Sequence, residues 1–216
     1  MTITESRKDG LIMARCNDKL KDYIDKRDFG KTPEPNQEES ALEWASARPI
    51  FVIQKHDAST LHYDFRIEFD GVLKSWAVPK GPSIDPSKKR LAVPTEDHPL
   101  EYADFEGTIP EGEYGGGTVL IWDRGSYRVI DQDSEDSDGL SEQIDRGRIT
   151  IWLEGQKLTG GYALIRTGKG PKARWLLIKM KDEGASSDND PVSTQPRSVK
   201  SGRLLEQIRD DERDSD

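Results

Sequence analysis

Short runs of apolar residues, rich in β-branched and aromatic side chains, recur along the chain from Ile50 to Met180. Many of these runs are separated by turn signals such as Asp70-Gly71 and the stretch PEGEYGGG. Short strands at this spacing are typical of a closed sheet or sandwich, whereas alternating strands and helices need longer amphipathic segments between the runs. We therefore expect a mainly all-β fold, a closed antiparallel β-barrel of about eight strands.

The segments on either side of these runs differ from them in composition. Residues 1–48 mix charges and prolines, include one expected short helix at 17–26, and are predicted to form an N-terminal arm that folds over the body. Residues 49–181 are the predicted barrel domain. Residues 182–216 have the composition of a linker and are predicted to be an acidic, disordered tail.

The formal net charge of −9 is concentrated in two of these regions. Residues 131–145, predicted to be a solvated loop, carry seven acids and no base, and residues 182–216 carry ten acids and five bases. Without these two segments the rest of the chain has a formal charge of +3. The body is therefore mildly basic, so the acidic total does not exclude a nucleic-acid substrate.

The chain has no apolar run long enough for the core of a signal peptide or for the ~20 residues of a membrane helix. Its one cysteine, Cys16, cannot form an internal disulfide or a cysteine zinc cluster. We expect a soluble, cytoplasmic monomer that makes no membrane contact.

Two of the three histidines lie in the stretch QKHDASTLHYDFRIEF, residues 54–69. On a strand that begins at Leu61, alternate side chains share a face, so His62, Asp64 and Arg66 point away from the apolar residues between them. Neighbouring positions on one face are about 7 Å apart, which lets an imidazole and a carboxylate lean onto one ion. This face is therefore a candidate site for chemistry.

The same stretch can supply a third ligand and a phosphate-binding group. His56 precedes a predicted turn at DAST and can complete a site for Mn, Zn or Fe in the +2 state. Arg66 can bind a phosphate or carboxylate beside the metal through two parallel N–H groups. The alternative interpretation is a set of surface ion pairs on a solvated strand face.

The third histidine, His98, lies in AVPTEDHPLEYADFEG, a loop-like segment between two predicted strands. Histidine can donate or accept a proton near neutral pH, and loops commonly present functional groups, although a hydrogen-bonded loop histidine is the alternative. The stretch PEGEYGGGT lacks the Lys-Ser/Thr ending of a nucleotide-triphosphate loop and precedes a strand, so we interpret it as a tight turn.

Three long motifs connect these residues to a known family. The chain contains, in order, KRDFGKTPEP, KHDASTLHYDFRIEFDGVLKSWAVPKGPSIDP and KRLAVPTEDHPLEYADFEGTIPEGEYGGGTV. Together they closely resemble the 3′-phosphoesterase domain of bacterial DNA ligase D and its free-standing archaeal and bacterial relatives. The resemblance covers roughly residues 22–180. Because no polymerase or ligase segment is recognised, the chain looks like the free-standing form.

This resemblance implies a Mn²⁺-dependent hydrolase that acts on 3′ ends of DNA or RNA in non-homologous end joining, with other divalent transition metals as an option. Members of the family remove a 3′-terminal ribonucleoside from a primer-template to leave a 3′-phosphate, and then remove that phosphate. A repair ligase or polymerase is an expected partner. The family fold is a β-barrel with a polar active site on one side.

The resemblance also implies roles for individual residues. His56, His62 and Asp64 would bind the metal, while Arg66 and His98 would bind the scissile phosphate. His98 would either stabilise the transition state or protonate the leaving oxygen. Further positions that match residues important for activity in the family are Tyr102, Lys80, Arg90, Glu96, Arg27, Asp28 and Glu34.

Two functions of other classes are also consistent with parts of the pattern. His62, Asp64 and His98 fit the two-histidine, one-carboxylate set of non-haem Fe(II) oxygenases, which would consume oxygen with Fe²⁺. A non-catalytic barrel that binds nucleic-acid ends and recruits a repair ligase would bind 3′-phosphate ends and leave them unchanged.

Overall fold

The apolar runs form one nine-stranded antiparallel sheet in a computed structural model that describes residues 18–36, 42, 45, 48–130, 139–170 and 173–213. The strands are β1 (Ile50–Asp57), β2 (Leu61–Phe69), β3 (Val72–Val78), β4 (Arg90–Pro94), β5 (Gly107–Ile109), β6 (Gly117–Val129), β7 (Arg148–Gly155), β8 (Thr159–Thr167) and β9 (Arg174–Lys179). The helices are α2 (Lys21–Asp25), the 3₁₀ helix η1 (Leu100–Asp104), α3 (Leu140–Arg146), α4 (Pro191–Thr194) and α5 (Leu205–Arg213).

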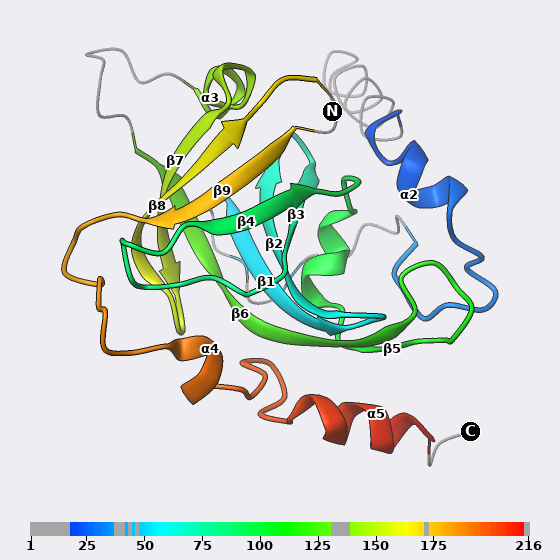
Figure 1. Cartoon of the computed structure of the whole chain (residues 1–216). Coiled ribbons are helices and arrows are strands. Elements are labelled where there is room, and N and C mark those ends of the chain that lie inside the picture. Colours follow the sequence, from blue (N-terminus) through cyan, green and yellow to red (C-terminus); the bar gives the residue numbers. More distant parts are fainter. Residues whose placement is uncertain are drawn as a thin grey trace, which may run out of the picture.

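The sheet closes on itself, which confirms the predicted barrel (Figure 1). The strand order is β1-β2-β3-β4-β9-β8-β7-β6, and β1 pairs with β6 to complete a ring of eight strands. The short β5 pairs with β6 outside this ring. Since β1 and β2 have a partner on each side, they provide a rigid frame for the side chains that they carry.

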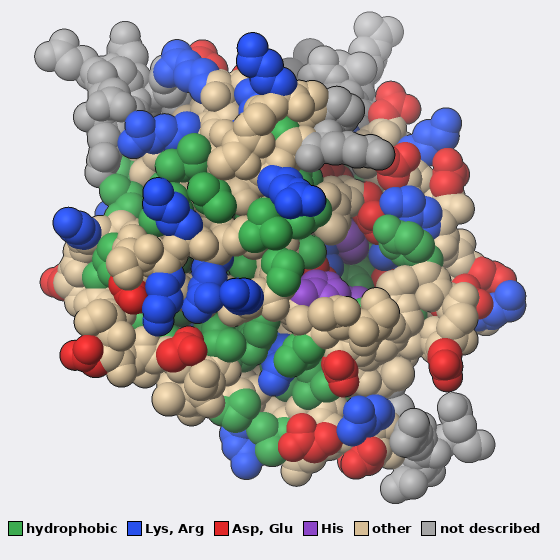
Figure 2. Space-filling view, in the orientation of Figure 1, with side chains coloured by type: hydrophobic (Ala, Val, Ile, Leu, Met, Phe, Trp, Pro, Cys, Tyr) green, Lys and Arg blue, Asp and Glu red, His purple; other side chains and the backbone are tan. Residues whose placement is uncertain are grey.

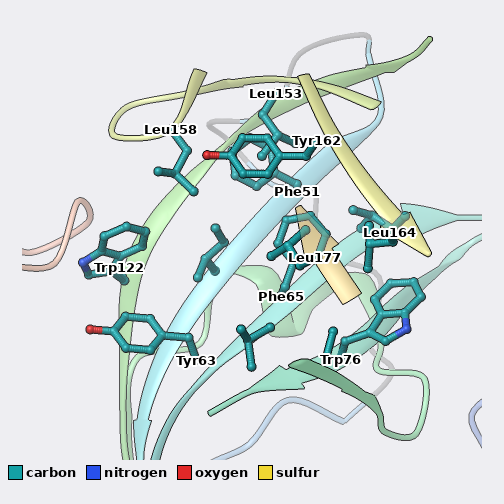
Figure 3. Packing of buried hydrophobic residues seen from close by; sticks show 14 of the residues in the cluster. Phe51, Tyr63, Phe65, Trp76, Trp122, Leu153, Leu158, Tyr162, Leu164 and Leu177 are labelled. Carbon is teal, nitrogen blue, oxygen red and sulfur yellow. The ribbon is translucent and has the colours of Figure 1, made fainter. Parts of the chain in front are cut away.

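The interior of the barrel is filled by large apolar side chains from all around the ring (Figure 3). Phe51, Phe65 and Trp122 are almost fully buried there, and Tyr63 meets the Trp122 ring edge-on at a centroid distance of 5.4 Å. Their positions alternate along β1, β2 and β6 with residues that point outward. The interior is therefore a packed core and not a binding cavity.

A second apolar cluster lies outside the barrel, between β1 and a cover made by η1 and the N-terminal arm. Tyr23 of α2, Val52 of β1 and Tyr102 of η1 belong to it and are buried. The polar face of β2 lies beneath the same cover, with Asp64 and Arg66 only 5% and 3% exposed. The interpretation of this face as a solvated one is therefore wrong, because the arm and η1 exclude water from most of it.

The segment after Asp182 differs from the predicted disordered tail in its described part. Leu205 and Ile208 of α5 are buried in the main core, and the carbonyl of Gln195 accepts a hydrogen bond from the Trp122 indole at 2.8 Å. Glu106 also accepts hydrogen bonds from Ser198 and from Arg203. Sparse apolar residues at helical spacing thus hold an otherwise polar segment against β5 and β6.

Two other expectations can be compared with the structure. Helix α2 lies within the predicted 17–26 segment, of which residue 17 falls outside the described residues, as does Cys16. The predicted loop at 131–145 is partly helical, because its second half enters α3, where Leu140 is buried. Residues 131–138 lie outside the described residues.

No described helix has the length and apolar character needed to cross a membrane.

Candidate active site

The hairpin of β1 and β2 brings the three predicted metal ligands together. The antiparallel register places His56 directly opposite His62, and their ring centroids are 4.9 Å apart. Asp64 follows two residues later on the same face of β2. One ligand atom from each of the three side chains lies within 4.8 Å of the others.

Backbone carbonyls determine which nitrogen each histidine presents to Asp64. Nε2 of His56 is 2.9 Å from the Gly115 carbonyl, and Nδ1 of His62 is 2.8 Å from the Thr60 carbonyl. Because a carbonyl only accepts, each of these nitrogens carries the proton. The opposite nitrogens, Nδ1 of His56 and Nε2 of His62, face Asp64 and lie 3.7 Å and 3.6 Å from its oxygens.

The charge of Asp64 also suits a metal ligand. Burial works to raise the pKa of its carboxyl, but the Arg66 guanidinium and the two histidine rings outweigh burial and hold that pKa below its ordinary value. A carboxylate and two imidazole nitrogens that face it form a donor set for Mn, Zn or Fe in the +2 state. The residues therefore fit the metal that the sequence predicts.

Arg66 is held by hydrogen bonds on every side of its guanidinium group. Nε donates to Gln54 at 2.7 Å, Nη1 donates to the Ser75 hydroxyl at 2.9 Å, and Nη2 donates to Asp64 at 3.0 Å. The group also lies 4.9 Å from the centre of the Tyr102 ring. This arrangement fixes Arg66 beside the metal cluster and leaves one N–H of Nη2 without a partner among the described residues.

His98 lies next to Arg66 and not within the metal cluster. Its Nδ1 is 2.9 Å from Arg66 Nη1, and its ring meets the Tyr102 ring at a centroid distance of 4.6 Å. Burial and the positive charges of Arg66 and Arg27 hold the pKa of His98 well below its ordinary value, so the ring is neutral. The oxygenase-type set of His62, Asp64 and His98 is therefore not the set that the fold brings together.

These groups line one pocket of about 160 Å³. In the space-filling view, histidine atoms are visible in a hollow near the middle of the face, with charged side chains beside them (Figure 2). One end of the pocket is the metal cluster and the other is formed by residues of the arm and of two loops. The lining residues are Arg27, His56, Ala58, His62, Asp64, Arg66, Thr95, Glu96, His98, Tyr102, Ile109, Tyr114 and Gly115.

The arm contributes Arg27 to the pocket wall. Its Nε donates to the buried carboxylate of Glu34 at 2.9 Å, its Nη1 lies 3.3 Å from Glu96, and its guanidinium carbon is 3.7 Å from the centre of the Tyr23 ring. Glu96 in turn accepts hydrogen bonds from Lys26 at 2.9 Å and from the Tyr114 hydroxyl at 3.2 Å. Ion pairs thus tie the arm to the loop that carries Glu96, and a hydrogen bond ties that loop to the loop that carries Tyr114.

Three of the predicted site residues lie elsewhere. The Asp28 side chain is 53% exposed and bonds within its own turn, to the Gly30 backbone N–H and to Lys31. Lys80 is exposed in the turn after β3. Arg90 lies opposite Leu177 of β9, so strand alternation places it on the interior face of the sheet, away from the metal cluster.

Gln54 is a residue of the site that the sequence analysis missed. It is fully buried, accepts the hydrogen bond from Arg66, and donates through Nε2 to the carbonyls of Tyr102 and Phe105 at 2.9 Å and 3.0 Å. It therefore connects the arginine to the backbone of η1 and the residue after it. Its position two residues before His56 on β1, on the same face, was the signal that could have identified it.

Comparison with known proteins gives consistent matches. The family described as the DNA Ligase D 3′-phosphoesterase domain matches residues 54–166. The "Multifunctional non-homologous end joining protein LigD" of Pseudomonas aeruginosa is 49% identical over 189 residues, which cover 86% of this chain and 22% of that protein. The LigD proteins of Mycobacterium tuberculosis and Mycolicibacterium smegmatis are 42% and 45% identical over 84% and 80% of the chain, and 23% and 22% of their own lengths. The chain thus spans less than a quarter of these relatives.

Proposed function

Because this chain belongs to the DNA ligase D 3′-phosphoesterase domain family, we propose that it is a Mn²⁺-dependent hydrolase that repairs 3′ ends of nucleic acid in end joining. It removes a 3′-terminal ribonucleoside to leave a 3′-phosphate, and then removes that phosphate to leave a 3′-hydroxyl. The observation that carries the proposal is the location of a fitting metal donor set and two buried arginines in a single small pocket.

The two arginines bind the scissile phosphate. Arg66 has one N–H of Nη2 beyond its bond to Asp64, and the Nη2 group of Arg27 has no hydrogen bond to a described residue. Both side chains line the pocket, where low polarity strengthens their attraction for a phosphate. Their rigid mounting means that little reorganisation is needed when negative charge develops on the phosphate oxygens.

His98 contributes to the phosphate site as a neutral ring and not as a general acid. Its Nδ1 lies 2.9 Å from both Arg66 Nη1 and the Glu96 carbonyl, so two neighbours fix this side of the ring. The depressed pKa of the ring leaves no imidazolium to transfer a proton at neutral pH. Tyr102 keeps the ring in place by packing against it.

His56, His62 and Asp64 would hold a divalent metal, which would supply positive charge to the phosphate and help to orient the attacking water. The protein residues give this site its shape: the two carbonyl-bound histidines keep their other ring nitrogens directed at Asp64, and Arg66 keeps Asp64 ionised. Glu96 and Glu34 position Arg27 across the pocket.

An end-processing assay tests this function. A primer-template that ends in one ribonucleotide is incubated with Mn²⁺ or with chelator, and the products are separated on a gel. Wild type should shorten the primer to a 3′-phosphate and then to a 3′-hydroxyl only with metal. His62→Ala should abolish both steps, whereas a matched change outside the pocket, Lys31→Ala, should preserve them.

Two results would contradict the proposal. A primer that binds but stays intact with every divalent metal would favour the non-catalytic barrel that recruits a repair ligase. Activity that survives His62→Ala would show that the metal is held elsewhere.

A further inference from the structure

Tyr114 is an aromatic side chain at the mouth of the pocket that the mechanism above does not use. It is 48% exposed, whereas the other lining residues except Thr95 are buried or partly buried. Only Ile24, Leu61 and Leu91 are comparably exposed large hydrophobic side chains in the described part of the chain. An exposed ring beside a phosphate-sized pocket is placed to contact whatever is attached to the phosphate.

The loop around Tyr114 holds the ring in a defined position. Gly112 and Gly115 have φ angles of 95° and 79°, which a residue with a Cβ rarely adopts, so they let the loop turn back on either side of the ring. The Tyr114 hydroxyl donates to Glu96 at 3.2 Å, and the Lys26 ammonium lies 4.7 Å from the ring centre. The ring is therefore pre-positioned while nearly half of it stays accessible.

The size of the pocket indicates where a nucleoside must lie. Sites that enclose a whole small molecule usually measure about 300–1,000 Å³, and this pocket measures about 160 Å³. A phosphate group fits inside, but a nucleoside joined to it must extend out of the mouth. The wall next to the mouth then determines how that nucleoside is held.

Charge favours one direction for this extension. A hollow of about 690 Å³ borders the pocket on the far side of the loop, but it is lined by the carboxylates of Asp57, Glu111 and Glu113 with Arg209 as the only cation among its described lining residues. On the other side of the loop, Tyr114 lies next to Lys26 and Arg27, which together outnumber the carboxylate of Glu96 that they share. A polyanion is repelled by the first surface and opposed less by the second.

We propose that Tyr114 stacks on the base of the 3′-terminal ribonucleoside and thereby positions that nucleoside for removal. The inference rests on the proposed function, since it assigns a binding partner to the group that leaves in the first step. Stacking on an aromatic ring accepts every base, because each base has a π-face. It would therefore select ends that carry a terminal nucleoside without selecting a sequence.

A binding experiment tests the stacking directly. A primer-template ending in the ribonucleoside of 2-aminopurine, a base whose fluorescence is quenched by stacking, is titrated with protein in chelator, so that no turnover occurs. Wild type and Tyr114→Phe should quench the signal, whereas Tyr114→Leu should lose the quenching and bind about five- to one-hundred-fold more weakly, the range expected for one stacked base. Leu91→Ala, which removes another exposed apolar side chain, serves as the control.

Kinetics then separate stacking from a merely structural role. For Tyr114→Leu, KM for removal of the terminal ribonucleoside should rise by a similar factor, while removal of a 3′-phosphate changes by no more than about two-fold, because that end has no nucleoside to stack. Equal losses in both steps, or unchanged quenching in Tyr114→Leu, would overturn the inference. A wild type that processes neither end would instead overturn the proposed function.

Discussion

Asp64 is the residue at which metal binding and phosphate binding meet. Each of its two oxygens faces a ring nitrogen of one histidine, and one of them also accepts a hydrogen bond from Arg66. A neutral side chain of the same shape keeps the hydrogen bond but removes the negative charge that a divalent cation requires. Substitution of Asp64 by Asn therefore tests the charge of the site while keeping its shape.

We expect Asp64→Asn to weaken Mn²⁺ binding by at least about 10- to 100-fold, the loss seen when even a residue next to a metal ligand is removed. Isothermal titration with Mn²⁺ measures the change. Asp28→Asn is the matched control, because that carboxylate is 53% exposed and bonds only within its own turn. Equal affinity in the two variants would show that the metal does not bind at Asp64.

Gln54 is a second single residue on which the site depends, because it supports Arg66 through a hydrogen bond. Substitution by Leu, which has a similar shape, would leave the Arg66 Nε–H and the Phe105 carbonyl without a partner, while the Tyr102 carbonyl keeps its bond from the Phe105 N–H. Since each buried unpaired polar group costs about 1–3 kcal/mol, we expect Gln54→Leu to lower the free energy of unfolding by about 2 kcal/mol or more. Urea unfolding measures this loss.

The control for Gln54→Leu is Gln156→Leu, at an exposed turn position. There we expect a change within about 0.5 kcal/mol, as for most surface substitutions. A similarly small effect for Gln54→Leu would mean that Arg66 does not depend on this hydrogen-bond network.

At the scale of single elements, the turn between β7 and β8 is held by one buried carboxylate. Oδ1 of Asp123 on β6 accepts hydrogen bonds from the backbone N–H groups of Gln156 and Lys157 at 2.9 Å and 3.0 Å, and Oδ2 accepts one from Leu158 at 2.9 Å. The Asp123 side chain thus accepts hydrogen bonds from three consecutive backbone N–H groups, as a neighbouring strand would do elsewhere in the sheet. Burial outweighs these bonds and raises the pKa of Asp123 to about 6.

This raised pKa predicts a pH-dependent stability. The folded protein binds a proton at Asp123 more tightly than the unfolded chain does, so the contribution is complete below about pH 4 and is lost as the pH rises through 6. Relative to Asp123→Asn, wild type should lose about 2–3 kcal/mol of unfolding free energy over that interval. Parallel pH profiles in urea unfolding would contradict the assignment.

At the scale of the whole molecule, the barrel depends on a segment that follows its last strand. Ile208 of α5 is fully buried in the same apolar cluster as the barrel core. In Figure 1, α4 and α5 run along the lower side of the barrel, beneath β6. Truncation of a buried Ile to Ala typically costs about 2–5 kcal/mol, through lost burial and the cavity left behind.

We therefore expect Ile208→Ala to lower the unfolding free energy by about 2–5 kcal/mol, measured by thermal or urea unfolding. Glu206→Ala on the exposed side of the same helix should change it by less than about 0.5 kcal/mol. Equal loss of stability in both variants would show that burial of Ile208 is not the cause.

The barrel and its metal cluster could be predicted because both follow from strand alternation, which is local. His56, His62 and Asp64 needed only a hairpin and a period of two to meet. The placement of Arg90 could not be foreseen, since it depends on the pairing of β4 with β9, more than eighty residues apart. The sequence analysis also missed that residues 205–213 form a packed helix, because two buried side chains in a charged helix give little apolar signal.

The pocket has two parts of different origin: a metal cluster on one hairpin of the closed sheet, and a wall that contains Arg27 from an arm outside the sheet. Among the described residues, no strand pairing connects the two parts, and they are joined by side chains such as Glu96. In evolutionary terms they are separable modules. A change in the arm can alter which nucleic-acid end is accepted while the hairpin keeps its metal, so divergence within the family should concentrate in the arm and spare the hairpin.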